Sequence, residues 1–427
     1  MQRIFKATNV VLVLLCAMYF VTYIVRQNIN TAGITIQQEF GLSNTQLGLV
    51  FSAYAYAYLL FQITGGWLGD RFGARNTLFV SGLVWAVATI LTSFAAGLTS
   101  LFLIRVLLGF GVGATLPTAT RAMQHWVESK NRGFAQGITH AFARIGNAAT
   151  PPLVAVLVVA FGWRNSFQMM GAIGLLWVLA WFWCFRDDPK DHPTITQEEL
   201  ALLPQRPKGP RPAVPWRALI GRMWPVTLTY FCYGWCFWLY LNWLPSFFKN
   251  SYDLDIGKAA IFAGGVFVAG VIGDTMGGVI SDAVLHKTGN IRLARIGVTV
   301  LGLVGTFLSL LPILYVRNIT TVALCLSSGF FFVELLIGPM WAIPMDIAPK
   351  YSGTAAGLMN SGSAFAAIVS PLVAGYVIDV TDNSFLPFLM SMVLLAAGMV
   401  TAFLMHPEKP FTEESPTLGT PATVPAE

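Results

Sequence analysis

Four arginines lie within long apolar stretches of this sequence, and three of them could bind an anion. Arg26, Arg105 and Arg144 each follow or interrupt a run of apolar residues. A charged side chain at the centre of a bilayer costs about 2.5–3.5 kcal/mol on insertion scales, so it usually faces a cavity or a partner. A guanidinium group in a cavity can hold a carboxylate through two parallel hydrogen bonds. The pattern therefore indicates a site for an organic anion.

Each arginine also has a simpler interpretation. Arg26 could extend along the helix toward the outer surface, and Arg105 could be an anchor at the outer interface. Arg144, one helical turn from His140, could belong to a face that meets water at the inner edge. The fourth arginine, Arg121, lies at the inner end of its stretch, which favours an interfacial role.

Two acids also interrupt apolar stretches, and they are candidates for proton coupling. Glu334 lies in "SSGFFFVELLIGPMWAIP" and Asp274 in "GVIGDTMGGVISD". A buried carboxyl group can take up and release a proton, so we predict that both residues take part in coupling. Alternatively, Glu334 forms a permanent ion pair with one of the arginines. The five cysteines show no metal-ligand spacing, and we expect neither a metal nor a cofactor.

The composition and the apolar runs define the elements that must position these residues. The chain of 427 residues is 55% hydrophobic and only 11% charged, against roughly a quarter charged in soluble domains. Runs of about 20 apolar residues recur, and each can cross a hydrocarbon core of about 30 Å as a helix. The sequence predicts an all-α membrane protein with twelve transmembrane helices, at about 8–34, 45–69, 76–96, 99–121, 134–160, 165–186, 222–247, 258–281, 293–316, 319–342, 352–378 and 384–405.

The polar segments predict the domain organisation and the orientation. We expect a six-helix bundle at 1–186, a cytoplasmic linker at 187–221, a second bundle at 222–406 and a disordered cytoplasmic tail at 407–427. Lys and Arg gather on the side that carries both termini, which the positive-inside rule assigns to the cytoplasm. This bias explains the net charge of +6, so we expect no nucleic-acid partner.

An internal repeat relates the two predicted bundles. "SKNRGFAQGITHAFARIGNAATPPLVAVL", from Ser129, aligns with "PKYSGTAAGLMNSGSAFAAIVSPLVAGYV", from Pro349. A second pair is "GGWLGDRFGAR" at 65–75 and "GGVISDAVLHKTGNIRLAR" at 277–295. Such pseudo-symmetry is typical of secondary transporters, which bind substrate between the halves near the midplane.

These motifs resemble a known family. "GGWLGDRFGAR" resembles the cytoplasmic signature of the major facilitator superfamily, and the degraded copy lies where that family carries one. Within it, the chain is most similar to the anion:cation symporters, through "YIVR", "YLLFQITGGWLGDRFG", "RVLLGFGVGATLP" and "WLYLNWLPSFF". The resemblance covers the chain to about residue 405. It implies the twelve-helix fold, alternating access, and transport of sugar acids or other organic anions.

The resemblance also assigns residues to the site. It matches Arg26 to an arginine that binds the substrate carboxylate, Arg105 to one that lines the cavity, and Tyr58 to a tyrosine that contacts the substrate. Together with the residue pattern, it gives as predicted substrate-binding residues Arg26, Tyr23, Tyr58, Arg105, Arg144, Gln62, Asn242, Trp341 and Asn360.

The signature itself has a structural interpretation. Its glycines allow close helix approach, and Asp70 could meet a helix N-terminus or Arg132 on the next inner loop. We expect this contact to hold the two halves in the outward-open state. The predicted gating residues are Gly66, Asp70, Arg71, Arg75, Arg132 and Asp282.

The sequence departs from the symporter pattern at the two acids that usually couple transport to protons. Val25 and Val112 occupy those positions, and a valine cannot carry a proton. The first helix also resembles that of organophosphate:phosphate antiporters, but their seventh-helix arginine is replaced by Phe237.

We therefore expect a secondary transporter of a small organic anion, driven by proton symport through Glu334 or by exchange for another anion. It should be a monomer in the cell inner membrane, and no motif indicates an enzyme or ATP drive. The alternatives are an organophosphate-type anion exchanger and a ligand sensor built on a transporter fold.

Overall fold

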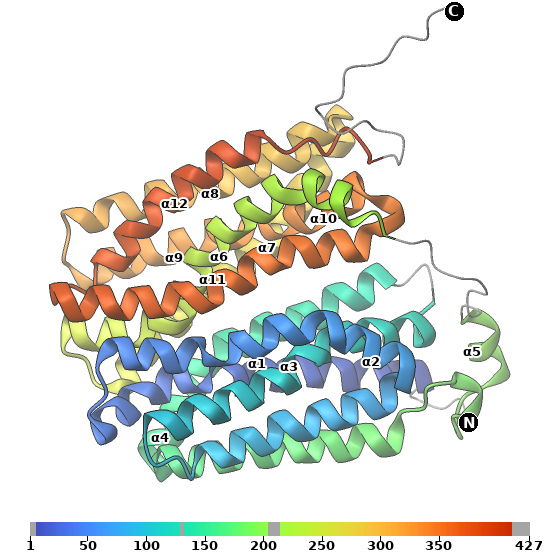
Figure 1. The fold of residues 1–427 in the computed structure, drawn as a ribbon, viewed down its shortest axis with the longest axis horizontal. Coiled ribbons are helices and arrows are strands. Elements are labelled where there is room, and N and C mark those ends of the chain that lie inside the picture. Colours follow the sequence, from blue (N-terminus) through green and yellow to red (C-terminus); the bar gives the residue numbers. More distant parts are fainter. Residues whose placement is uncertain (1–5, 129–131, 204–213, 412–427) are drawn as a thin grey trace, which may run out of the picture.

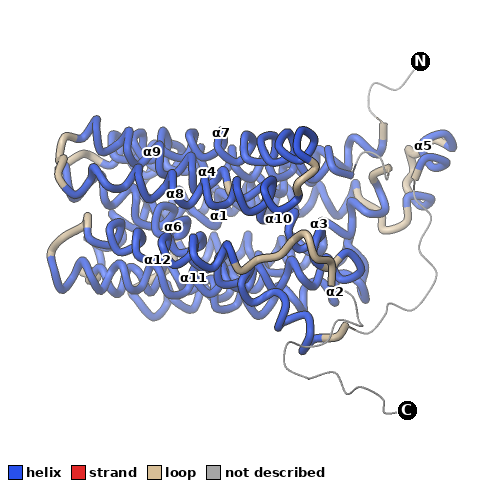
Figure 2. Tube along the Cα trace, turned by 90° about the horizontal axis from the view of Figure 1, so that it is seen from above, coloured by secondary structure: helices blue, strands red, loops and turns tan. Residues whose placement is uncertain are grey.

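The computed structural model describes residues 6–128, 132–203 and 214–411. Within these ranges every regular element is helical, and the long helices run side by side in two groups (Figure 1; Figure 2). Nine helices among the described residues are long and apolar enough to cross a membrane. This agrees with the predicted all-α membrane protein.

The first group is a six-helix bundle whose six spans lie in four helical elements. Two of them contain two spans each, because the chain bends at Gly73 (φ 82°) and at Gly162 (φ 79°) without leaving the helix for more than one residue. A positive φ of this size is strained for any residue but glycine. The helices are α1 (Ala7–Phe40), α2 (Asn44–Thr92), α3 (Leu98–Trp126) and α4 (Arg132–Cys184).

The second bundle supplies the other six spans, which completes the predicted twelve. One of these spans is α9 followed by α10, with a break at Leu336. Its elements are α6 (Trp216–Tyr252), α7 (Ile256–Thr288), η3 (Leu293–Gly297), α8 (Val298–Leu310), η4 (Leu311–Leu314), α9 (Ile319–Leu335), α10 (Ile337–Ile347), η5 (Pro349–Tyr351), α11 (Ser352–Thr381) and α12 (Leu386–Phe403).

The segment between the bundles folds back on the first bundle. It contains η2 (Pro189–Asp191) and α5 (Gln197–Leu202). The Glu199 carboxylate of α5 accepts hydrogen bonds from the backbone N–H and the hydroxyl of Thr8, at 3.3 and 3.1 Å. We call this end of the molecule the α5 end and the opposite end the far end (Figure 1). The predicted linker and tail boundaries stay predictions, and residues 412–427 lie outside the described residues.

The two bundles are in close contact at the far end. The Asp379 carboxylate, on the last turn of α11, accepts hydrogen bonds from the backbone N–H groups of Asn44 and Thr45 at the start of α2, at 2.9 and 2.7 Å. A Cβ on Gly48 would collide with the Pro371 carbonyl oxygen of α11. Figure 1 shows the two groups of helices diverging from this contact toward the α5 end.

Candidate functional site

Arg26 lies within α1 and meets the second bundle at Trp238 of α6. It is only 3% exposed. Its guanidinium carbon is 4.1 Å from the centre of the Tyr23 ring on the same helix and 5.2 Å from the Trp238 ring of α6. Both bundles therefore contribute an aromatic face to this cation, and such a contact stabilises a desolvated guanidinium by about 2 kcal/mol or more.

Arg105 lies directly behind Arg26. Its Nη2 donates a 2.9 Å hydrogen bond to the Arg26 backbone carbonyl, and its guanidinium carbon is 5.3 Å from the Tyr54 ring. The Nε atoms of both arginines are buried without a hydrogen-bond partner among the described residues. Since a buried donor without an acceptor is costly, these two groups are suited to receive an anion.

Tyrosines of α2 extend the wall of the site. The Tyr54 ring is 5.9 Å from Trp238 and 6.0 Å from Tyr58, measured between ring centres. Tyr54 and Tyr58 are both buried. The structure thus brings the predicted contact Tyr58 into the same aromatic group as Arg26, together with Tyr23.

Arg144 occupies a different position from the other two arginines, because acids hold it from across the interface. Its Nε is 2.8 Å from the Asp274 carboxylate of α7, and its Nη1 is 3.3 Å from the Glu334 carboxylate of α9. The side chains are 13% exposed for Arg144, 21% for Asp274 and 2% for Glu334. All three predicted residues therefore form one cluster, which joins the first bundle to the second.

Packing between α1 and α4 sets this cluster beside the Arg26 site. The Cβ that Gly146 lacks would be 3.3 Å from the Tyr23 Cβ, and the Tyr19 and His140 rings have centres 5.6 Å apart. Gly146 is two residues from Arg144 along α4, and Tyr23 is three residues from Arg26 along α1. Both charged groups therefore act on the same region between the bundles.

Three other predicted substrate contacts, all in the second bundle, either bond to a residue of that bundle or are only half-buried. The Asn242 amide donates to the Trp238 carbonyl of its own helix at 2.7 Å, and Trp341 Nε1 donates to the Tyr230 hydroxyl at 3.0 Å while remaining 38% exposed. Asn360 is half-buried on α11. The side chain of Gln62 lies outside those that the structure describes.

The polar residues that follow Arg26 also reach the interface, which the sequence reasoning did not assign. Asn30 Nδ2 donates to the Leu241 carbonyl of α6 at 2.9 Å, and it also contacts Gln27. Gln27 and Asn30 are both buried. The signal was present in the run "RQNIN", in which three amides follow an arginine within an apolar helix.

Part of the signature motif acts as a tight bend. The Arg75 backbone N–H donates to the Asp187 carboxylate at 3.1 Å, and the Arg75 guanidinium donates to the Phe182 carbonyl at 2.7 Å. A Cβ on Gly65 would collide with Ala114 of α3, which fits the expected close helix approach. Arg71 is exposed. The surroundings of Gly66 and the side chains of Asp70 and Arg132 are not among those described, so the predicted contact of Asp70 stays a prediction.

The second copy of the motif is built around an arginine that was not predicted. Arg295 Nη1 lies 3.3 Å from the carboxylate of the predicted residue Asp282, and its Nε lies 2.9 Å from that of Asp346 on α10. Arg295 ends the repeat "GGVISDAVLHKTGNIRLAR" as Arg75 ends "GGWLGDRFGAR", and this correspondence could have identified it.

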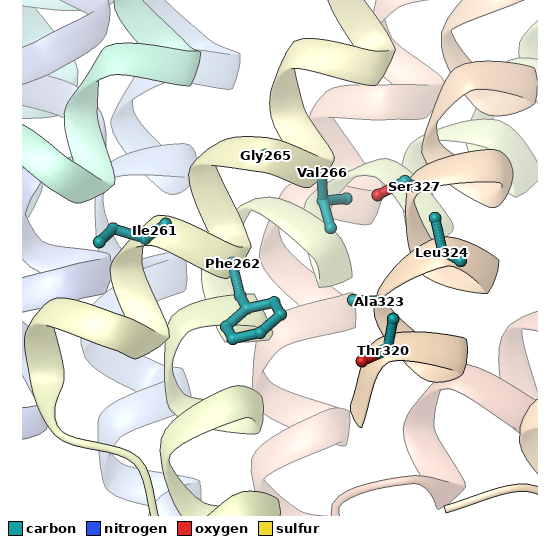
Figure 3. A pocket seen from close by; sticks show the side chains of 8 residues that line it. All are labelled: Ile261, Phe262, Gly265, Val266, Thr320, Ala323, Leu324 and Ser327. Carbon is teal, nitrogen blue, oxygen red and sulfur yellow. The ribbon is translucent and has the colours of Figure 1, made fainter. Parts of the chain in front are cut away.

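A groove between α7 and α9 lies apart from these residues (Figure 3). It encloses about 320 Å³ and has apolar walls, with the hydroxyls of Thr320 and Ser327 as its polar groups. Ile261 and Leu324 on its rim are about two-thirds exposed. A groove without an ionisable side chain does not suit a charged ligand, so the candidate site is the interface around Arg26.

Comparisons with known proteins identify the family of the chain. A family profile described as Major Facilitator Superfamily covers residues 15–371. A protein of Cupriavidus necator named as a probable sulfoacetate transporter is 46% identical, over 95% of each chain. An Escherichia coli protein named as a probable galactarate/D-glucarate transporter is 30% identical over 84% of this chain and 85% of its own. The hexuronate transporter of Bacillus subtilis is 28% identical over 95% and 94%.

Solved structures support the fold. A bacterial homologue of the human lysosomal transporter Spinster, in an inward-facing and unoccupied conformation, matches with a TM-score of 0.79 at 18% identity, over 93% of this chain and 97% of that one. The same type of protein in an inward-facing and occupied conformation matches with a TM-score of 0.78 at 15% identity, over 95% and 98%. At this identity the likeness concerns the fold alone.

Proposed function

The chain belongs to the major facilitator superfamily, and on that basis we propose that it carries a small organic anion across a membrane by alternating access. The predicted resemblance and the twelve-helix fold are confirmed. The similar proteins are named as transporters rather than enzymes. The observation that carries the proposal is Arg26, a buried cation between the bundles with an unpartnered donor.

The chemistry of the site favours an anionic ligand. Arg26 presents a guanidinium between two aromatic rings, an arrangement that holds a carboxylate or sulfonate by paired hydrogen bonds. The relative with 46% identity is named for sulfoacetate, and others are named for hexuronate and for galactarate or glucarate. Sulfoacetate is therefore the first compound that we would test.

For coupling, we propose proton symport through Glu334. Val25 and Val112 leave no acid next to Arg26 or in the middle of α3, whereas Glu334 is a buried carboxylate that contacts Arg144 across the interface. A proton on Glu334 would weaken one of the two cross-bundle ion pairs of Arg144. Protonation and bundle movement would thereby be linked.

We also propose the orientation and the state. The excess of Lys and Arg on the α5 end assigns that end to the cytoplasm under the positive-inside rule, with the protein in the inner membrane and both termini inside. The bundles are in contact at the far end through Asp379, which corresponds to a carrier closed to the outside. The expected monomer stays a prediction.

The test is counterflow of labelled sulfoacetate and sugar acids into proteoliposomes. We expect Arg26→Lys to reduce uptake at least tenfold, since an ammonium group cannot form the paired contact. Arg217→Lys, at an exposed position of α6, is the matched control and should behave as the wild type. Full uptake by Arg26→Lys would contradict the anion-binding role. Binding without counterflow would instead indicate a sensor on the same fold.

A further inference from the structure

The buried charges at the interface do not balance among themselves. Arg26 and Arg105 have no acidic partner among the described residues, whereas Arg144 is paired with Asp274 and Glu334. With every group ionised, three arginines and two carboxylates leave a net charge of +1 (3 − 2). The charge also differs between two places: the two unpaired arginines carry two positive charges, and the Arg144 cluster carries one net negative charge.

The loaded site is most stable when each of these two regions is neutral, because uncompensated charge in a membrane interior is costly. A singly charged anion would leave one positive charge between Arg26 and Arg105 and one negative charge in the Arg144 cluster. A doubly charged anion would neutralise both arginines. One proton would then neutralise the cluster.

The geometry points to a substrate with two negative charges that binds together with one proton, and the proton goes to Glu334. This inference rests on the proposed function and specifies its substrate class. Arg26 and Arg105 each have a buried Nε donor without an acceptor, so there are donors for two anionic groups. Each cycle would carry the dianion and the proton, a net charge of −1.

Glu334 is better suited than Asp274 to take the proton. Asp274 is held by Arg144 at 2.8 Å and is 21% exposed, while Glu334 is 3.3 Å from Arg144 and only 2% exposed. Of the two carboxylates, the more buried and less tightly paired one loses the least electrostatic stabilisation when it takes up a proton and becomes neutral. The groups that act electrostatically on it are Arg144 of α4, Asp274 of α7, and Tyr230 and Tyr233 of α6, with His140 of α4 beside the cluster. Tyrosines are uncharged near neutral pH, and a proton on His140 would be repelled by the Arg144 guanidinium. The carboxylates are therefore the groups that bind the proton in this proposal.

The test compares acids that differ only in charge. Calorimetry on the purified full-length protein would measure the Kd of sulfoacetate, malonate and succinate, each beside its monoamide, in which a neutral amide replaces one carboxylate. We expect the dianion to bind at least about tenfold more tightly than its monoamide, because one unit charge near a guanidinium contributes more in a partly desolvated site than in bulk water. Equal affinity of the acid and its amide would overturn the inference.

The pH dependence tests the proton separately. Between about pH 7 and 9, the Kd of the dianion should rise by up to about tenfold per pH unit, and that of the monoamide should stay flat. In Glu334→Gln, which cannot take up the proton, the dianion should bind with a flat profile. Glu198→Gln, an exposed acid-to-amide change on α5, should keep the wild-type slope. A slope that persists in Glu334→Gln would overturn the inference. If no acid of either charge binds and none shows counterflow, the proposed function itself is wrong.

Discussion

Asp379 offers the sharpest test of how the bundles are held at the far end. Its carboxylate accepts four hydrogen bonds from the start of α2, two from Asn44 at 2.9 Å and two from Thr45 at 2.7 and 2.5 Å. It therefore acts as a negatively charged N-cap that the second bundle supplies to a helix of the first. Separation of the bundles at this end requires all four bonds to break.

The change Asp379→Asn keeps one acceptor oxygen and turns an NH₂ group toward the other donors. Two charge-assisted bonds are lost at an exposed position, where each is worth about 0.5–1 kcal/mol. The loss of about 1.4 kcal/mol corresponds to a roughly tenfold shift toward the state that is open at the far end.

Spin labels at Asn165 and Tyr315 would report this shift, since both are exposed and each belongs to a different bundle. Pulsed spectroscopy should show a larger population of long distances in Asp379→Asn. The control is Asp382→Asn, three residues along the chain, where the backbone is left-handed (φ 50°) and asparagine is tolerated. Identical distance distributions in Asp379→Asn and the control would refute the reasoning.

Two further predictions concern packing and pH. Gly48→Ala should populate the same open state as Asp379→Asn, because its Cβ meets the α11 backbone; wild-type distances would contradict this. Burial of Glu199 raises its pKa, but hydrogen bonds from Thr196 and Thr8 outweigh this effect and lower it below 4.5. Its stabilising contact with α1 should thus be complete at neutral pH and be lost as the pH falls through the lowered pKa of Glu199. The rate of hydrogen exchange of α5 should rise at that low pH. Glu199→Gln should raise the exchange rate already at neutral pH, because it weakens the contact of α5 with α1 by about 1 kcal/mol. Glu198→Gln should leave the exchange rate unchanged.

The sequence predicted what lies along single helices, and it offered an ion pair between Glu334 and an arginine without identifying which arginine, a pair that the structure shows with Arg144. The number of spans, the repeat and the buried arginines follow from hydropathy and from the cost of charge in a membrane. The pairing of Arg144 with both Asp274 and Glu334 could not be read from these patterns, since it depends on the packing of α4 against α7 and α9. The Asp379 contact could not be predicted from the sequence for the same reason. It joins residues more than 330 positions apart.

The placement of the acids also explains how a chain with Val25 and Val112 could still respond to protons. In the symporter pattern an acid stands beside the first-helix arginine, so the proton and the substrate meet within one bundle. Here the acids belong to the second bundle and reach Arg144 of the first at 2.8 and 3.3 Å. A proton on Glu334 therefore removes a contact between the bundles rather than within one. Under the proposed coupling, an anion binds near Arg26 while Glu334 becomes neutral, so the interface loses an ion pair as the site becomes electrically balanced. Among the described residues, Asp274 is then the acid that still pairs with Arg144 across the interface, beside the contacts of Arg26 and Asn30 with α6.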